Sequence, residues 1–65
     1  MITNAAKLAR LRFIDSMMDY YGWMNRKQLT DIFSISAPQA SNDLSDYQME
    51  FPDNIVYNLS AKRYE

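Results

Sequence analysis

The chain contains neither cysteine nor histidine, so no disulfide and none of the usual zinc sites can hold it together. A chain of 65 residues buries only about 60% of its unfolded surface, which leaves a core near the lower limit for independent folding. The stability of that core must come from side-chain packing alone. The same absences remove Cys–His pairs and the Ser-His-Asp triad, and a single glycine excludes glycine-rich phosphate loops. We therefore expect one small domain that is not an enzyme and has no metal or cofactor.

The net charge of −1 would weigh against a binder of nucleic acid if the charges were spread evenly. They are not, because residues 31–53 contain acids and no base, whereas 1–12 contain bases and no acid. Two isolated basic pairs stand at 26–27 and 62–63. The chain also has no apolar run typical of an export signal or a membrane span, which favours a cytoplasmic protein without membrane contacts.

The first half of the chain predicts two helices with recognisable ends. The first is expected over 5–21 and ends at Gly22, the residue that adopts a left-handed backbone without steric cost. The second begins after Asn25, whose spacing to Gln28 matches a capping box, and it ends at 33–34.

The second half predicts a third helix, over about 37–48, and a β-hairpin over 55–65 that places Tyr57 and Tyr64 on one face. A short β-bridge is expected at 23–24. Helix, short strand, helix, tight turn, helix and hairpin is the order of a winged helix-turn-helix. The predicted fold is therefore mainly α, of the α+β class, with the hairpin as the wing.

In this fold the third helix enters the major groove and reads base edges mainly from its N-terminal half. Residues 37–42 contain no acid and no large apolar side chain. With Ala40 facing the core, the polar side chains point outward, and Gln39 and Asn42 can each pair bidentately with adenine. The predicted DNA contacts of this segment are Ser36, Ala37, Pro38, Gln39, Ser41 and Asn42. The alternative is a solvated capping segment without a ligand.

The two basic pairs lie where such a fold touches phosphate. Arg26 and Lys27 open the second helix, which crosses the DNA backbone in this geometry. Lys62 and Arg63 follow the hairpin tip, where a wing reaches an adjacent groove or phosphate. The alternatives are a solvated basic pair in the first case and a frayed charged terminus in the second.

The remaining charged residues near the third helix and in the first helix are not assigned to DNA contacts. Asp43, Asp46 and Glu50 are predicted to share one flank of the third helix, beyond the turns that approach DNA. Lys7 and Arg10 could contact DNA or a partner, and the sequence does not distinguish the two.

The first helix has an apolar arc wider than the stripe that a surface helix needs. Its excess residues predict a dimer or partner interface made of Phe13, Met17, Tyr20 and Trp23. A two-fold dimer would place paired recognition helices on an inverted repeat. The alternatives are that the hairpin covers these residues, or that the domain is a protein-interaction or dimerisation module that does not bind DNA.

Four segments carry a family resemblance: N-R-K-Q-L at 25–29, F-S-I-S-A-P-Q-A-S-N-D-L at 33–44, P-D-N-I-V-Y at 52–57 and S-A-K-R-Y at 60–64. They resemble the N-terminal winged helix-turn-helix domain of WYL-domain transcriptional regulators, in particular repressors that control bacterial anti-phage defence islands. The resemblance covers about residues 10–65, and P-Q-A-S is its most specific part.

The resemblance implies a homodimeric repressor that binds double-stranded DNA at an inverted-repeat operator and continues into a WYL ligand-sensing domain. Residues 1–65 would then be one DNA-binding module of a longer, nucleoid-associated regulator. One position departs from the family pattern, since Ser34 stands where glycine is usual in the turn between the second and third helices. If this residue is left-handed, serine costs about 1 kcal/mol relative to glycine.

Overall fold

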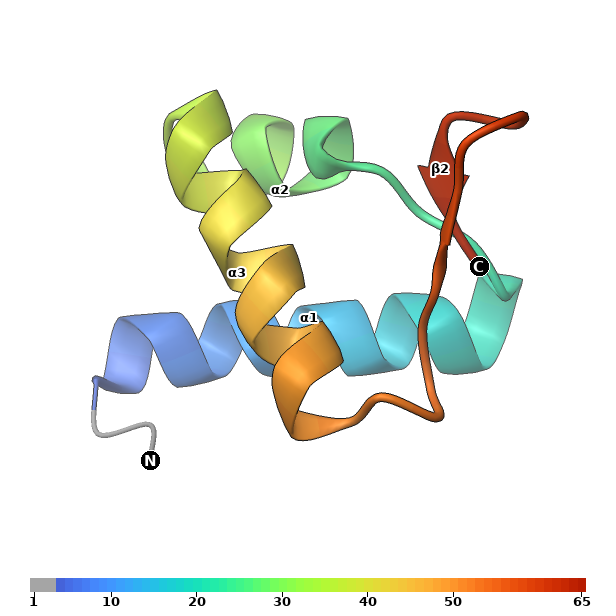
Figure 1. Cartoon of the computed structure of the whole chain (residues 1–65). Helices are drawn as coiled ribbons and strands as arrows, with labels where there is room; N and C mark the ends of the chain where they lie inside the picture. Colours follow the sequence, from blue (N-terminus) through green and yellow to red (C-terminus); the bar gives the residue numbers. More distant parts are fainter. Residues whose placement is uncertain (1–3) are drawn as a thin grey trace.

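The computed structural model describes residues 4–65, which form three helices followed by a two-stranded hairpin (Figure 1). The elements are α1 (Ala5–Tyr21), α2 (Arg26–Phe33), α3 (Ala37–Glu50), β1 (Tyr57–Asn58) and β2 (Arg63–Tyr64). This order confirms the predicted winged helix-turn-helix, with α3 two residues longer than expected. The domain was predicted to start at residue 1, and residues 1–3 lie outside the described part of the chain.

Short-range hydrogen bonds fix the helix ends, and those at Gly22 and at Asn25 were predicted from the sequence. Asn4 Oδ1 accepts from two backbone N–H groups in the first turn of α1, and Gly22 ends that helix with φ of 78°. Asn25 and Gln28 form the predicted capping box, in which Gln28 Oε1 accepts from the Asn25 N–H at 2.9 Å. These caps satisfy backbone groups that a helix leaves unpaired at its ends.

Ser34 ends α2 in the left-handed region with φ of 56°, as its place in the tight turn predicts. Its side chain is exposed, so little is lost by removing it. We expect Ser34→Gly to raise the free energy of unfolding by about 1 kcal/mol, measured by denaturant titration. The matched control is Ser16→Gly, on the exposed face in the middle of α1, which should lower it by about 0.5 kcal/mol. Equal signs for the two variants would contradict this account.

The core lies where α3 crosses α1 and α2 (Figure 1). It consists of Leu11, Ile14, Met24, Leu29, Ala40, Leu44, Tyr47 and Ile55, all buried. The inward-facing side of α3 is as predicted, with Ala40, Leu44 and Tyr47 spaced along one stripe. Ile35, in the turn before α3, packs against the same cluster.

The hairpin is hydrogen-bonded to the segment between α1 and α2. Tyr57 pairs with Tyr64 across the two strands, and their ring centroids lie 4.8 Å apart, as expected for side chains on one face. The predicted bridge forms between Met24 and Tyr64, whose backbones exchange two hydrogen bonds of 2.9 and 2.7 Å. The wing is therefore held to the helical core by backbone pairing as well as by side chains.

Tyr47 joins α3 to α1 and to the turn after α3. Its hydroxyl donates to Asp15 Oδ1 at 2.6 Å and accepts from Asn54 Nδ2 at 3.3 Å. Burial raises the pKa of Tyr47 above its ordinary value, and the hydrogen bond to Asp15 raises this pKa further. A raised pKa means that the phenol stabilises the fold fully below about pH 10 and loses this contribution as the pH rises through the folded value.

We therefore expect the melting temperature to stay level up to about pH 10 and to fall above it. Calorimetry or circular dichroism between pH 7 and 11 would measure this. The Tyr47→Phe variant has no phenol to ionise at this position, so its melting temperature should fall less over the alkaline range. An identical alkaline fall in the two proteins would show that Tyr47 does not contribute.

Candidate nucleic-acid interface

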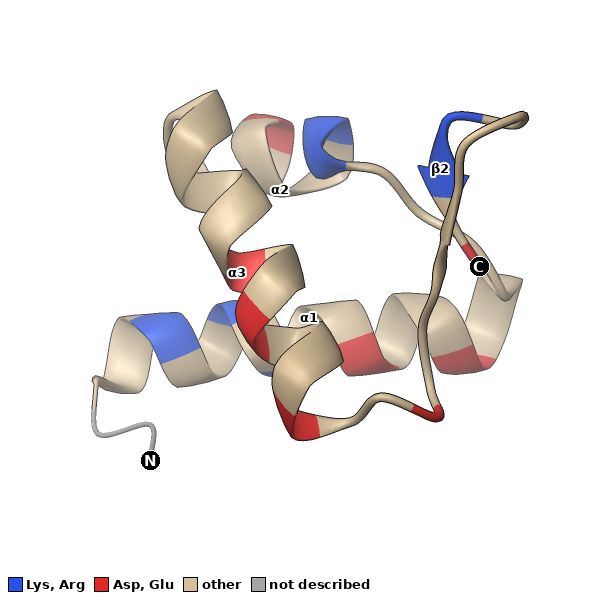
Figure 2. Ribbon diagram, in the orientation of Figure 1, with Lys and Arg blue, Asp and Glu red and all other residues tan. Residues whose placement is uncertain are grey.

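The outer face of the first half of α3 is free of charge (Figure 2). Pro38 and Asn42 are exposed there, and Ser36, also exposed, caps the helix by accepting from the Gln39 N–H at 3.2 Å. Ala37 is only partly exposed. The structure adds Ser45 to this face, one turn beyond Asn42. Its helical spacing from Asn42 was a sufficient signal, but the predicted contact segment stopped at residue 42.

Two of the side chains expected to point outward are partly buried and already hydrogen-bonded. Gln39 Nε2 donates to Asp43 Oδ1 at 3.0 Å, and Ser41 Oγ accepts from Arg26 Nη1 at 3.2 Å. The amide nitrogen of Gln39 carries two N–H groups, and the bond to Asp43 uses one of them. The second N–H and the carbonyl oxygen remain for a base, so the bidentate pairing of Gln39 stays a prediction, as does that of the exposed Asn42.

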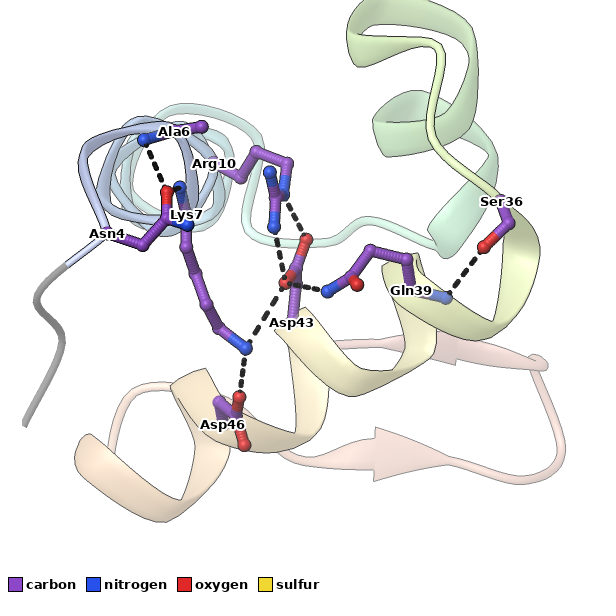
Figure 3. A network of polar contacts seen from close by, with 8 residues as sticks. All are labelled: Asn4, Ala6, Lys7, Arg10, Ser36, Gln39, Asp43 and Asp46. Atoms are coloured by element: carbon purple, nitrogen blue, oxygen red, sulfur yellow. Dashed lines mark hydrogen bonds and ion pairs between the residues drawn. The ribbon is translucent and has the colours of Figure 1, made fainter.

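The acidic flank predicted for α3 is largely neutralised from within (Figure 3). Asp43 is 0% exposed, and it accepts from Arg10 Nε at 2.5 Å and lies 3.5 Å from Lys7 Nζ. Lys7 also binds Asp46, and this hydrogen bond raises the pKa of the lysine. A buried carboxylate is tolerated because several donors surround it.

This network answers the question left open for Lys7 and Arg10, since both contact acids of α3. Of the three acids, only Glu50 is exposed.

A basic groove of about 500 Å³ lies between the start of α2, α3 and the wing. Figure 2 shows the basic residues of α2 and of the wing on the same edge of the molecule. The groove is lined by Asn25, Arg26, Lys27, Ser41, Tyr57, Lys62 and Tyr64. Three of these side chains are cationic and none is acidic. Burial raises the pKa of Tyr64, so this phenol stays a neutral hydrogen-bond donor. Asn25, Tyr57 and Tyr64 were not predicted as part of the interface.

The predicted basic residues differ in how freely they can reach a ligand. Arg26, Lys27 and Lys62 are exposed, and the exposed ion pair of Lys27 with Asp31, at 3.0 Å, is of a kind worth little in water. Lys62 has φ of 56° at the tip of the wing. The three exposed cations are therefore the strongest candidates for phosphate contacts.

The side chain of Arg63, by contrast, contacts other residues of this domain. Its guanidinium carbon lies 5.0 Å from the centre of the Trp23 ring, and its Nε donates to Glu65 Oε2 at 2.7 Å. Hydrogen bonds from Asn58 and from Arg63 lower the pKa of Glu65. These contacts hold the second strand of the hairpin in place, so Arg63 supports the position of Lys62.

The four residues predicted as an apolar interface are unequally exposed. Phe13 packs edge-on against Phe33 of α2, with ring centroids 5.4 Å apart, and Met17 packs against the core. Trp23 is partly covered by Arg63 of the hairpin. Only Tyr20, at 81%, is largely exposed. The remaining apolar surface of the arc is thus smaller than the sequence indicated, because α2 and the hairpin each cover part of it.

Comparison with known proteins decides the family. Residues 6–65 match the model of the BrxR transcriptional regulator winged helix-turn-helix domain. The chain belongs to this family. The resemblance drawn from the sequence motifs is thereby confirmed for the winged helix-turn-helix domain.

The BrxR-type domain is also similar to longer proteins, each named DNA-binding transcriptional repressor CapW. It is 51% identical to the protein of Escherichia coli (strain KTE188), 49% to that of Stenotrophomonas maltophilia and 44% to that of Pseudomonas aeruginosa. Each match extends over 55 residues, which are 85% of this chain and 18% of the relative. The chain thus spans about a fifth of the length of these relatives. Within residues 4–65, the BrxR-type domain has no helix long and apolar enough to cross a membrane.

Proposed function

We propose that this chain binds double-stranded DNA sequence-specifically, as the DNA-binding domain of a transcriptional repressor. The observation that carries the proposal is the juxtaposition of an uncharged, exposed helix face with a groove lined by three cations. Base edges are read by polar side chains on a helix that must enter the major groove, whereas phosphates are bound by Lys and Arg beside it. The names of the CapW relatives support the same function.

In the proposed complex, the N-terminal half of α3 lies in the major groove with Asn42 at its centre. Pro38, Ala37 and Ser36 approach the same groove, and the Ala37 N–H at the start of the helix faces phosphate. Arg26 and Lys27 at the start of α2 bind the phosphate backbone, and Lys62 of the wing binds the adjacent backbone or minor groove. Ser41 lies between these two regions, at the edge of the basic groove.

We further propose that the protein acts as a homodimer on an inverted-repeat operator, in the bacterial cytoplasm at the nucleoid. Dimeric helix-turn-helix proteins place one recognition helix in each half-site, about one helical turn of DNA apart. The ring of Tyr20, with the neighbouring Tyr21 at 60% exposure, offers an aromatic surface for such contact. Residues outside this chain would contribute the rest of the interface in relatives that are about five times longer.

The test is titration of the purified protein with inverted-repeat promoter duplexes at two or more salt concentrations. We expect saturable binding that weakens with salt, with a log–log slope of about −2.7 for each protomer if three cations each neutralise one phosphate. A specific duplex should bind more tightly than a scrambled duplex of the same length. Absence of saturable binding at low salt would overturn the proposal.

A second candidate is a winged-helix interaction module that does not bind DNA. The observation that favours it is the exposed ring pair of Tyr20 and Tyr21, whose centroids lie 4.7 Å apart. On this alternative, Tyr20→Asp abolishes association with the partner while Asn42→Ala has no effect on any activity. Loss of DNA binding in Asn42→Ala, with Tyr20→Asp still binding DNA as a monomer, would reject it.

A further inference from the structure

We infer that the hydroxyl group of Tyr64, in the wing, donates a hydrogen bond to the DNA phosphate that Arg26 is proposed to bind. This inference rests on the proposed DNA binding and adds to it a binding residue that carries no charge. A neutral donor contributes to affinity without releasing counterions, so its contribution can be measured apart from those of the cations.

The side chain of Tyr64 is held in place before any ligand binds. Its backbone exchanges two hydrogen bonds with Met24, in the segment between α1 and α2. Its ring is half-buried and meets the ring of Tyr57 edge to face, with centroids 4.8 Å apart. A side chain that is already ordered loses little conformational entropy on binding, which favours a net contribution to affinity.

The hydroxyl group of Tyr64 has no hydrogen-bond partner within residues 4–65. The hydroxyl of the buried Tyr47, by contrast, makes two hydrogen bonds. Since no buried side-chain oxygen in the described part of the chain lacks a partner, the Tyr64 hydroxyl is open to solvent. Tyr64 lines the basic groove of about 500 Å³, so this free O–H is available to a ligand that enters the groove.

Arg26 lies near this phenol and acts on its ionisation. Burial raises the pKa of Tyr64 and Tyr57 raises it further, whereas the positive charge of Arg26 lowers it. The pKa remains above its ordinary value, so at neutral pH the phenol keeps its proton and can donate it to an acceptor. Arg26 is held from the opposite side, because its Nη1 donates to Ser41 Oγ at 3.2 Å. That bond uses one N–H of the guanidinium, and the others remain for a ligand.

The free hydrogen-bonding groups of the groove are mainly donors. Its three cationic side chains only donate, and its lining contains no acid. Two polar oxygens of the lining each already accept a bond from the domain. Asn25 Oδ1 accepts from the Lys27 N–H at 3.0 Å, and Ser41 Oγ accepts from the guanidinium. Such a groove fits a ligand that offers acceptors and negative charge. A phosphodiester offers both, whereas the edges of bases mix donors with acceptors.

The groove also adjoins the helix face that is proposed to read the bases. Ser41 of α3 lines the groove, and the next residue, Asn42, is exposed on the outer face of that helix. A phosphate in the groove would therefore belong to the DNA backbone beside the bases that α3 contacts. Tyr64 would bind this phosphate from the side of the wing and Arg26 from the side of α2.

The first experiment compares two tyrosine-to-phenylalanine variants by fluorescence anisotropy at several salt concentrations. Tyr64→Phe keeps the ring and removes the free hydroxyl. We expect its affinity for DNA to fall about fivefold or more, equally for specific and scrambled duplexes, with the log–log salt slope unchanged to within about 0.3. The matched control, Tyr47→Phe, removes a hydroxyl that is bonded inside the domain, and its affinity should stay within about twofold of the wild type.

Thermal melting of the same variants separates a role in binding from a role in the fold. Tyr64→Phe should melt within about 2 °C of the wild type, whereas Tyr47→Phe should melt at a lower temperature because it loses two hydrogen bonds. Wild-type affinity in the Tyr64→Phe variant would overturn the inference. So would a loss of affinity confined to the specific duplex, which would indicate a contact with a base, or a melting temperature lowered as much as that of Tyr47→Phe.

The second experiment locates the phosphate. Single phosphates of the duplex are replaced in turn by uncharged methylphosphonates, and each duplex is titrated with the wild type, Tyr64→Phe and Arg26→Ala. We expect the effects of Tyr64→Phe and of the methylphosphonate to be non-additive by about threefold or more at one phosphate of the site bound by each protomer. Arg26→Ala should be non-additive at the same phosphate.

The two possible failures of this experiment have different meanings. Non-additivity at no phosphate, or at different phosphates for Tyr64 and Arg26, would overturn the inference and leave the proposed function intact. Failure of the wild type to bind any duplex would instead overturn the proposed function.

Discussion

Simultaneous replacement of Arg26, Lys27 and Lys62 by alanine is expected to weaken DNA binding by about a hundredfold or more at moderate salt. These three side chains are the cations of the basic groove, and none of them is used to hold the core together. Because phosphate contacts release counterions, the log–log salt slope should become less steep by about 2.7 per protomer. The loss should be the same for specific and scrambled duplexes, since phosphates carry no sequence information. Fluorescence anisotropy with labelled duplexes at several salt concentrations measures both effects.

Arg12→Ala is the matched control for the single variant Lys62→Ala, because each removes one exposed positive charge. Arg12 lies on α1, in a hollow with Leu8 and Phe51 away from the basic groove. The Arg12→Ala variant should leave the log–log salt slope of DNA binding unchanged, whereas Lys62→Ala should make this slope less steep by about 0.9. Equal effects of the two variants would mean that DNA responds only to the overall charge of the protein and not to the groove.

The largest effect on stability is expected from Ile14→Ala in α1. The side chain is 0% exposed, at the centre of the only large cluster of buried apolar residues in the described chain. Truncating such a residue costs about 2–5 kcal/mol, and a core of this size supplies about 3–5 kcal/mol in all. Most of the variant protein should therefore be unfolded at 25 °C, as measured by circular dichroism or by amide proton spectra.

Ile32→Ala makes the same chemical change on α2, where the side chain is 59% exposed. We expect it to change the free energy of unfolding by less than about 0.5 kcal/mol. A stable Ile14→Ala protein would show that the wing and the surface ion pairs contribute more to stability than the packing of the three helices does.

The sequence predicts the parts of this fold that depend on short-range signals. Asn25 with Gln28 and Gly22 mark helix ends through bonds to their own backbone neighbourhood, and the structure confirms them. The left-handed backbone of Ser34 is also set locally, by the short turn that follows α2. Such signals involve residues at most a few positions apart, so helix ends and turns can be predicted from the sequence without knowledge of the tertiary contacts.

The candidate site could be predicted only in part, because its details depend on contacts between distant segments. The acids of α3 have the same sequence pattern whether they face water or the bases of α1, and only the crossing of the helices brings Arg10 to Asp43. Phe13 was likewise predicted at an interface, since nothing in the local sequence places Phe33 against its ring.

The backbone bridge between Met24 and Tyr64 also has a consequence for how the chain folds. It closes a loop that begins at residue 24 and ends at residue 64, about as long as the loop that the Lys7–Asp46 pair closes between α1 and α3. Closing a long loop carries an entropic cost that only the finished packing repays. During synthesis the three helices emerge before the hairpin, because the hairpin follows them in the chain, so the bridge can form only after α3 has been made. The groove proposed to bind the DNA backbone is thus completed only when the last residues of the hairpin are in place.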